Sequence, residues 1–456
     1  MYQTHPNSPP PQPALPEEER QKREADKRKA RKNNGAKRGI HYEMEQEEHD
    51  VYPDDPDFDI NKARLVTTAP RICVRYECVP MRFIKHVYKI HTYAQDGRLF
   101  EGKTPVSAFL NSSYDGSFIA GLMELRYIQS LPVERIINYF ESHGFTLKKP
   151  TAHKLMEKAS SLFENLYKCI RQTALSDPYK AADETYYKIL VPEKNSKGKG
   201  VRKGYLWVVV GINTRMIYLL YDDGSRSEKV ILNELGGCKG IIQSDGYSPY
   251  RKLESDAYPH ITRIPCLQHI KRKFIDCGED DPDAKRIVEM INTLYQNEHK
   301  HKIGVDGWTV EQNLVHRKKY APDILGEIKD VLDDIEERGD LLPKSELKEA
   351  ITYLRNEWNA VVDIFNYGDT YLDNNIVEQM NRYISLSRKN SLFFGSHKRA
   401  ERGAILYTIA LTCRMNKVNL FEYLTDIINR TAEWQPNTPL EKYRQLLPDR
   451  WEKAND

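Results

Sequence analysis

Apolar and polar positions alternate with different periods along the chain, and the changes of period divide it into segments. Residues 1–60 carry few large apolar side chains. A Pro-rich start precedes a basic block and then an acidic block, which predicts a disordered charged tail. Residues 61–114 alternate at a period of two over 72–76 and 85–90, which predicts a small strand-containing segment.

Residues 115–178 repeat apolar side chains at helical spacing and predict a helical domain. Within it, Pro132 suits the first turn of a helix, and Gly144 ends that helix before a second one begins near Pro150. A helix, a glycine turn and a helix form the outline of a helix-turn-helix unit, which can place a helix in DNA. An ordinary helical hairpin has the same outline, so both interpretations stay open.

Residues 179–270 return to a strand pattern. Apolar strands are predicted in hairpin order near 183–190, 205–210 and 216–221, and two further strands alternate with helices before residue 270. This order predicts an α/β fold with a mixed five-stranded sheet flanked by helices.

The rest of the chain has the pattern of helices. Residues 271–370 keep apolar side chains at helical spacing and predict a large all-helical insertion into the sheet domain. Residues 371–430 then complete the core with further helices, and residues 431–456 form a C-terminal tail.

Composition narrows the class of protein. The 456 residues suffice for two or three domains, and no apolar run is long enough for a membrane span. The polar, Pro-rich N-terminus lacks the apolar core of a signal peptide. Seven scattered cysteines fit a reducing cytosol, so we expect a cytoplasmic protein. The net charge of +3 conceals 69 Lys and Arg residues, enough for a basic groove if they cluster on one face.

Three carboxylates stand at chemically informative positions. Asp183 lies on the first strand of the predicted sheet, Asp245 ends the fourth strand, and Glu378 lies in the first turn of a helix after the insertion. Carboxylates from separate elements can hold a pair of Mg²⁺ ions about 4 Å apart, the arrangement that phosphoryl transfer requires. The sequence therefore predicts that these three residues form a catalytic metal site.

Each carboxylate also has an ordinary structural explanation. Glu184 competes with Asp183, because period-two alternation puts only one of them on the metal-binding face of the strand. Asp245 can be a plain turn residue, and Glu378 can form an ion pair with Arg382 four residues later.

Several motifs occur together in a fixed order: Ala182-Asp183-Glu184-Thr185, Gly204-Tyr205-Leu206-Trp207, Ser225-Arg226, Ser244-Asp245-Gly246-Tyr247, Cys266-Leu267-Gln268-His269, Asp373-Asn374-Asn375-Ile376-Val377-Glu378, Leu392-Phe393-Phe394-Gly395 and Leu447-Pro448-Asp449-Arg450-Trp451. In this order they resemble transposases of the insertion sequence 66 family, which are DDE enzymes with a ribonuclease-H-like core. The resemblance covers about residues 115–451.

The resemblance implies a function and a set of partners. Asp183, Asp245 and Glu378 would be the catalytic triad and would hold two Mg²⁺ ions, for which Mn²⁺ can substitute. The enzyme would cleave a DNA phosphodiester at the end of an insertion sequence, and the freed 3′-hydroxyl would then attack target DNA. The expected partners are DNA, further copies of the chain assembled on the DNA ends, and accessory proteins of the same element, at the nucleoid of a bacterial cytosol.

The N-terminal part departs from the family pattern. It has no long heptad region, and only Cys73 and Cys78 remain of a segment with paired cysteines. This departure leaves open whether the shortened region still recognises the element ends.

Basic and polar residues flank the predicted triad. His269 and Arg272 follow the fifth strand, and Arg388, Lys389 and Asn390 end the triad helix. Arg binds phosphate in a bidentate manner, so these positions are predicted to contact DNA. A solvated helix face is the alternative for the basic residues.

Cysteines suggest two zinc hypotheses that lack a full set of ligands. Cys73 and Cys78 have no second pair nearby, and Cys266, His269 and Cys277 have no fourth partner.

Two other functions fit much of the same sequence. A ribonuclease-H-like nuclease would cut DNA without joining it, and a non-catalytic remnant of a transposase would only bind DNA.

Overall fold

The computed structural model describes residues 45–67, 69–79, 82–105, 107–109, 112–194, 198, 200–435 and 437–452. The basic block of the predicted charged tail lies outside these residues. The acidic block lies partly within them and corrects the predicted disorder there, because strand β1 (Glu45–Val51) pairs in parallel with β4 (Arg82–Ile90). Polar side chains at most positions of β1 explain why no strand pattern was visible in the sequence.

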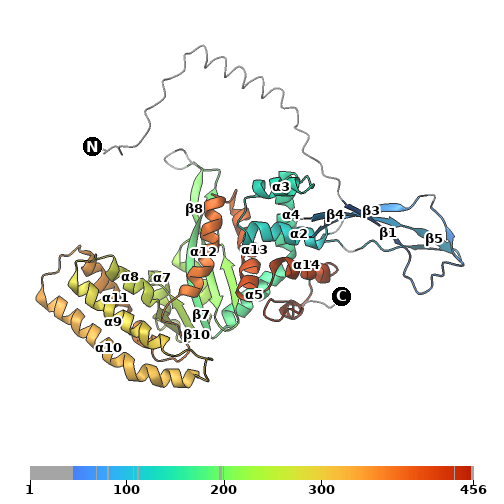
Figure 1. Cartoon of the computed structure of the whole chain (residues 1–456). Helices are drawn as coiled ribbons and strands as arrows, with labels where there is room; N and C mark the ends of the chain where they lie inside the picture. The colour runs from blue at the N-terminus through green and yellow to red at the C-terminus, as the bar shows by residue number, and fades with distance from the viewer. Residues whose placement is uncertain are drawn as a thin grey trace, which may run out of the picture.

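The N-terminal strands form two small sheets. In the first, β4 lies between β1 and β3 (Arg71–Val79). The second sheet contains β2 (Arg64–Leu65), β5 (Thr92–Gln95) and β6 (Arg98–Glu101). Figure 1 shows these strands (blue) extending away from the central sheet.

A group of helices connects the N-terminal strands to the central sheet. It comprises α2 (Gly116–Met123), a π-helical turn (Glu124–Ile128), α3 (Val133–Ser142), α4 (Lys149–Leu162) and α5 (Glu164–Ser176). The turn between α3 and α4 contains Gly144 at a φ of 85°, a conformation that favours glycine. The two helices therefore have the predicted helix–turn–helix outline.

The central sheet has five strands: β7 (Tyr179–Leu190), β8 (Val201–Gly211), β9 (Met216–Leu220), β10 (Gly240–Ser244) and β11 (Ile261–Pro265). Their order is β11-β10-β7-β8-β9. β7, β8 and β9 are antiparallel neighbours, whereas β10 runs parallel to both β7 and β11. The prediction of a mixed five-stranded sheet is confirmed.

Helices cover the sheet and close one of its edges. α12 (Asn375–Asn390) packs against β7 and β8, and α13 (His397–Met415) packs against β9. The hydroxyls of Thr408 and Thr412 on α13 accept hydrogen bonds from backbone amides of β9, at 3.0 and 3.2 Å. Two backbone amides of the edge strand β9 thus have hydrogen-bond partners on α13, which leaves fewer of its backbone groups free to pair with another chain.

Shorter helices complete this body. They are α6 (Glu228–Leu235), α7 (Ser248–Arg251) with the 3₁₀ turn Lys252–Glu254, α14 (Leu420–Thr431) and α15 (Leu440–Arg444). α14 packs against α2, so the C-terminal part of the chain contacts the helices that precede the sheet. No helix in the described part of the chain is both long and apolar enough to cross a bilayer.

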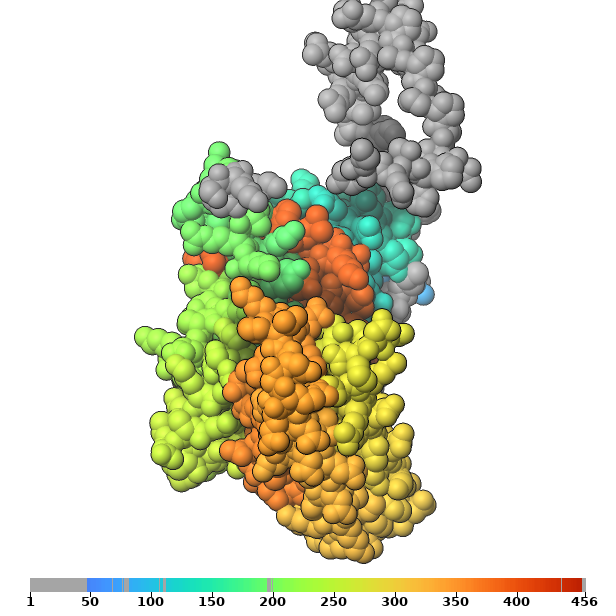
Figure 2. All heavy atoms as spheres, turned by 90° about the vertical axis from the view of Figure 1, so that its left-hand side faces the viewer, coloured from blue at the N-terminus to red at the C-terminus, as the bar shows by residue number. Residues whose placement is uncertain are grey.

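Four helices lie between β11 and α12: α8 (Leu267–Ile275), α9 (Pro282–His299), α10 (Val310–Arg338) and α11 (Glu346–Ile364). They share a hydrophobic cluster that also includes Tyr179, Ile241 and Ile264 of the sheet. In Figure 2 they (yellow to orange) fill the lower part of the visible face. Apolar contacts therefore join this insertion directly to β7, β10 and β11.

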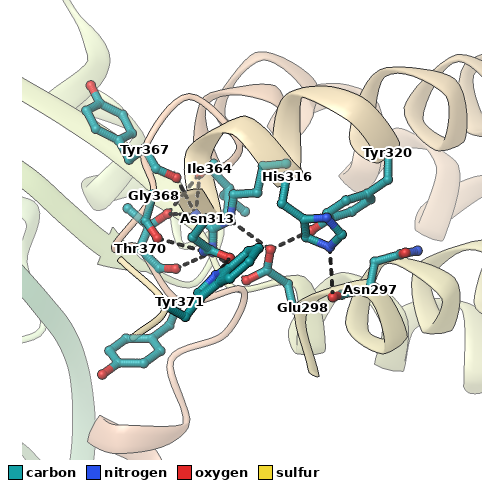
Figure 3. A network of polar contacts seen from close by, with 12 residues as sticks. Asn297, Glu298, Asn313, His316, Tyr320, Ile364, Tyr367, Gly368, Thr370 and Tyr371 are labelled. Carbon is teal, nitrogen blue, oxygen red and sulfur yellow. Dashed lines mark hydrogen bonds and ion pairs between the residues drawn. The ribbon is translucent and has the colours of Figure 1, made fainter. Parts of the chain in front are cut away.

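A buried polar network fixes α10 to the segment that leads to α12. Arg317, 1 % exposed, donates to Glu298 Oε1 of α9 at 2.8 Å and to both Thr370 Oγ1 and the Thr370 carbonyl, at 2.7 and 2.6 Å. Figure 3 shows Tyr367, Gly368 and Thr370 beside Asn313 of α10, with the Tyr367 ring pointing away from the network. The network closes the loop that returns the chain from the insertion to the sheet.

Candidate active site

Asp183 lies within β7, facing α12. Its Oδ2 accepts a hydrogen bond from Asn381 Nδ2 of α12 at 2.6 Å, and its Oδ1 accepts one from the Glu184 amide at 2.8 Å. Burial, together with the neighbouring carboxylates of Glu184 and Asp245, raises the pKa of Asp183 to about 7. Such a shift marks a carboxylate whose charge lacks a compensating cation in the protein itself.

Glu184 has a different environment from Asp183. Its Oε1 accepts from Arg226 Nε at 2.9 Å, and its Oε2 accepts from Tyr250 Oη at 3.3 Å. The Glu184 side chain is 5 % exposed, and burial raises its pKa while the Arg226 guanidinium opposes the increase. Of the two adjacent acids, Asp183 is therefore the one without a cationic partner.

Strand pairing places Asp245 beside Asp183. Gln243 of β10 is in register with Ala181 of β7, and Asp245 and Asp183 follow each of these residues by two positions in the same direction. Asp245 Oδ1 also accepts from the Tyr247 amide at 3.1 Å, so the residue does shape the turn after β10. Asp245 therefore has the turn role that the sequence offered as an alternative, and it also lies beside Asp183.

Gly246 allows the insertion to approach this turn. A Cβ at Gly246 would lie 2.4 Å from Tyr353 Oη of α11, and the Gly246 amide donates to that hydroxyl at 2.8 Å. The turn that carries Asp245 is thus held by a tyrosine from the helical insertion.

Glu378 is positioned by the N-terminus of α12. Asn374 precedes the helix, and its Nδ2 donates to the Ala182 carbonyl of β7 at 3.0 Å, while its amide donates to Cys266 Sγ at 3.2 Å. These contacts hold the first turn of α12 between β7 and the end of β11. Glu378 and Asn381 are three residues apart and so share one helix face.

The Glu378 side chain is 28 % exposed, and its Oε1 has no hydrogen-bond partner. His269 Nε2 lies 3.7 Å away. Glu378 and Arg382, both in the described part of the chain, form no ion pair, so the helical-pair alternative is not observed.

The three predicted acids come from adjacent elements: β7, the turn after β10 and the first turn of α12. Among the residues that the structure describes, their ligand atoms do not form one group within 4.8 Å of one another. A two-ion site does not require all three carboxylates to bind the same ion.

A cavity of about 360 Å³ lies beside Asp245. Its lining includes the basic side chains of Arg226, His269, Arg272 and Lys273. Arg226 stacks over the Tyr247 ring, with its guanidinium carbon 4.1 Å from the ring centroid. The predicted residues His269 and Arg272 therefore line the same cavity as Asp245, whereas Asp183 and Glu378 do not line it.

The other predicted DNA-binding residues differ in their surroundings. Arg388 donates to the Tyr186 carbonyl at 2.5 Å and stacks on the Tyr186 ring at 3.9 Å, and Asn390 Nδ2 donates to the Ser130 carbonyl at 3.2 Å. Lys389 is exposed. These contacts favour a positioning role for Arg388 and Asn390 over direct contact with DNA.

Two residues of the site were not singled out from the sequence. Asn381 is visible only as a polar residue three positions after Glu378, and nothing in the sequence ties it to Asp183. Arg226 stood within a family motif, but its pairing with Glu184 depends on the sheet geometry.

Comparison with known proteins identifies the family. A family model described as "Transposase IS66 family" matches residues 111–402, well over half of the chain. The chain belongs to this family. The matched region runs from just before α2 into the first turns of α13 and so includes Asp183, Asp245 and Glu378.

Three similar proteins come from Sinorhizobium fredii (strain NBRC 101917 / NGR234). Uncharacterized protein y4jD is 25 % identical over 346 residues, which cover 73 % of this chain and 65 % of y4jD. Uncharacterized protein y4hP is 23 % identical over 438 residues, which cover 87 % of this chain and 76 % of y4hP. Uncharacterized protein y4qI is 26 % identical over 384 residues, covering 80 % and 69 %. The chain thus spans just under two thirds of the length of y4jD.

Proposed function

We propose that the chain is a DDE transposase that cleaves DNA at the ends of an insertion sequence and joins those ends to target DNA. The observation that carries this proposal is the placement of three acids on β7, after β10 and on α12, in a chain of the IS66 transposase family. The strand order β11-β10-β7-β8-β9 supports a ribonuclease-H-like core, in which the first and fourth strands are neighbours.

The side chains present fit a pair of Mg²⁺ ions. Asp183 has a pKa raised to about 7 because it is buried and because the carboxylates of Glu184 and Asp245 lie near it, and Glu378 Oε1 has no hydrogen-bond partner. Hard oxygen ligands of this kind suit Mg²⁺ or Mn²⁺. Asp183, Asp245 and Glu378 would hold the ions, which when bound supply Lewis acidity for activating water and for stabilising charge at the reacting phosphate.

Two displacements at phosphorus follow from this arrangement. In the first, water attacks the phosphodiester at the element end, the bond to the 3′-oxygen breaks, and that oxygen leaves as a 3′-hydroxyl. In the second, this hydroxyl loses its proton and attacks a target phosphodiester, whose own 3′-oxygen leaves. No external energy source is required. The first step hydrolyses a phosphodiester, and the second replaces one phosphodiester bond with another.

The surrounding residues would position the DNA. Arg272 and Lys273 lie in the cavity beside Asp245 and can bind the phosphates that flank the scissile bond. Asn381 would orient Asp183, and Arg388 would hold α12 against β7. α3 and α4 are proposed to bind DNA as a helix-turn-helix unit, and the active form is proposed to be a cytoplasmic oligomer on paired ends, with accessory proteins of the element.

The test is a strand-transfer assay with labelled element-end DNA, target DNA and Mg²⁺. Wild-type protein should give cleaved and joined products. Asp183→Asn, Asp245→Asn and Glu378→Gln should each lower the rate at least about 10³-fold while leaving the circular dichroism spectrum unchanged. Asp330→Asn, an exposed acid on α10, is the matched control and should retain full activity.

Two outcomes would overturn the proposal. Cleavage without joined products would favour the ribonuclease-H-like nuclease. DNA binding without any metal-dependent cleavage would favour the non-catalytic remnant.

A further inference from the structure

Three side chains with different ligand chemistry meet where α8 begins and α12 begins. The thiol of Cys266, the imidazole of His269 and the carboxylate of Glu378 have ligand atoms that all lie within 4.8 Å of one another. Cys266 and His269 are three residues apart, a spacing that places both on one side of the first turn of α8. Glu378 faces them from the first turn of α12.

Two polar atoms of this group have no hydrogen-bond partner. His269 Nδ1 and Glu378 Oε1 are both buried without a hydrogen bond, and His269 Nε2 stands 3.7 Å from Glu378 Oε1, which is too long for one. Ligands of one tetrahedral zinc ion lie about 3.3–3.6 Å apart, given bonds of about 2.0–2.3 Å. Small side-chain movements would therefore bring this group to the spacing of a zinc site.

Burial raises the pKa of the Cys266 thiol to about 12, so the sulfur would lose its proton only as an ion binds, and the Asn374 amide is placed to stabilise the resulting thiolate. Cys266 is 1 % exposed, and its Sγ accepts a hydrogen bond from the Asn374 amide at 3.2 Å. An N–H group directed at sulfur stabilises negative charge there and orients the ligand. Cys277, the third member of the zinc set suggested by the sequence, lies at the other end of α8 and donates to the Lys273 carbonyl. The third ligand of the observed group is Glu378 instead of Cys277.

We propose that Cys266, His269 and Glu378 form a binding site for a thiophilic divalent ion of the Zn²⁺ type, with solvent as the fourth ligand. Sulfur and imidazole ligands select such an ion over Mg²⁺. The consequence rests on the proposed function: because Glu378 would also serve the Mg²⁺ pair, an ion held by Cys266 and His269 would withdraw that carboxylate from catalysis. Zinc would then inhibit the enzyme at its own active site.

The test is a titration of the metal-stripped full chain, without DNA, with Co²⁺ as a spectroscopic substitute for Zn²⁺. Wild-type protein should show a sulfur-to-cobalt charge-transfer band that saturates at one equivalent, disappears on addition of Zn²⁺ and persists in excess Mg²⁺. Cys266→Ser should lose the band, whereas Cys277→Ser, at a cysteine that follows the C-terminal end of α8 and lies outside the group, should keep it. Absence of the band from the wild type, its loss in Cys277→Ser alone, or its displacement by Mg²⁺ would overturn the proposal.

A second variant keeps the proposal testable if Cys266→Ser does not fold. His269→Ala should keep the band but bind Co²⁺ at least about tenfold more weakly, and unchanged affinity would contradict the proposed ligand set. Because the titration uses neither DNA nor catalysis, its failure leaves the strand-transfer proposal standing. Loss of strand transfer would likewise leave the Co²⁺ result unaffected.

Discussion

At the scale of single residues, Asp183 and Glu184 show what sequence reasoning could not decide. Both are acids on one strand, and alternation indicates only that they face opposite ways. Glu184 is paired with Arg226, whereas Asp183 faces Asn381 and has a pKa raised to about 7. The choice between them depends on partners that lie 42 and 198 residues away, and no local pattern encodes those contacts.

The raised pKa of Asp183 predicts a pH dependence of stability in the metal-free protein. The ordinary pKa is 3.8, so the folded state binds a proton more tightly than the unfolded chain, and the free energy of unfolding should fall as pH rises from about 4 to about 7. Asp183→Asn removes this penalty and should gain at least about 1 kcal/mol at pH 8 but little at pH 4.

Urea unfolding at both pH values measures the difference, and added Mg²⁺ should reduce the advantage of Asp183→Asn at pH 8. Equal stability of the two proteins at pH 8 without metal would show that ionisation of Asp183 does not destabilise the folded protein.

At the scale of elements, apolar periodicity predicted much of the architecture. The strands predicted near 183–190, 205–210 and 216–221 overlap β7, β8 and β9, because hairpin strands carry their own alternation. β1 was missed, since its acidic and polar residues gain their strand conformation only by pairing with β4. The polar network around Arg317 was also invisible, because its members come from α9, α10 and the loop after α11.

That network predicts a large effect of one substitution. Arg317→Ala leaves Glu298 and the Thr370 carbonyl without their buried cationic partner, and should lower the free energy of unfolding by about 3–5 kcal/mol. Lys319→Ala, at an exposed residue two positions further along α10, is the control and should cost under about 1 kcal/mol. Chemical denaturation measures both, and equal effects would mean that the network contributes little to anchoring the insertion.

At the scale of the whole molecule, the insertion and the sheet jointly build the region around the acids. Tyr353 of α11 holds the turn after β10, and α8 contributes basic residues to the cavity beside Asp245. The insertion could be predicted as helical, but its contribution to the site could not, because Tyr353 and Gly246 are 107 residues apart.

This arrangement predicts how DNA affinity should respond to salt. Arg272→Ala and Lys273→Ala should each weaken binding of element-end DNA and reduce the steepness of its salt dependence by about one unit per lost phosphate contact. Lys329→Ala, an exposed lysine on α10, should change neither quantity. Fluorescence anisotropy over a salt series measures both, and an equal response to all three variants would place the DNA elsewhere.

The most direct test of the central claim is diffraction from crystals of the protein grown with Mn²⁺, with data collected at the manganese absorption edge. The account predicts anomalous peaks for two ions bounded by Asp183, Asp245 and Glu378, and loss of these peaks in Asp183→Asn. Manganese that binds without contacting Asp183, or peaks that persist unchanged in the variant, would contradict it.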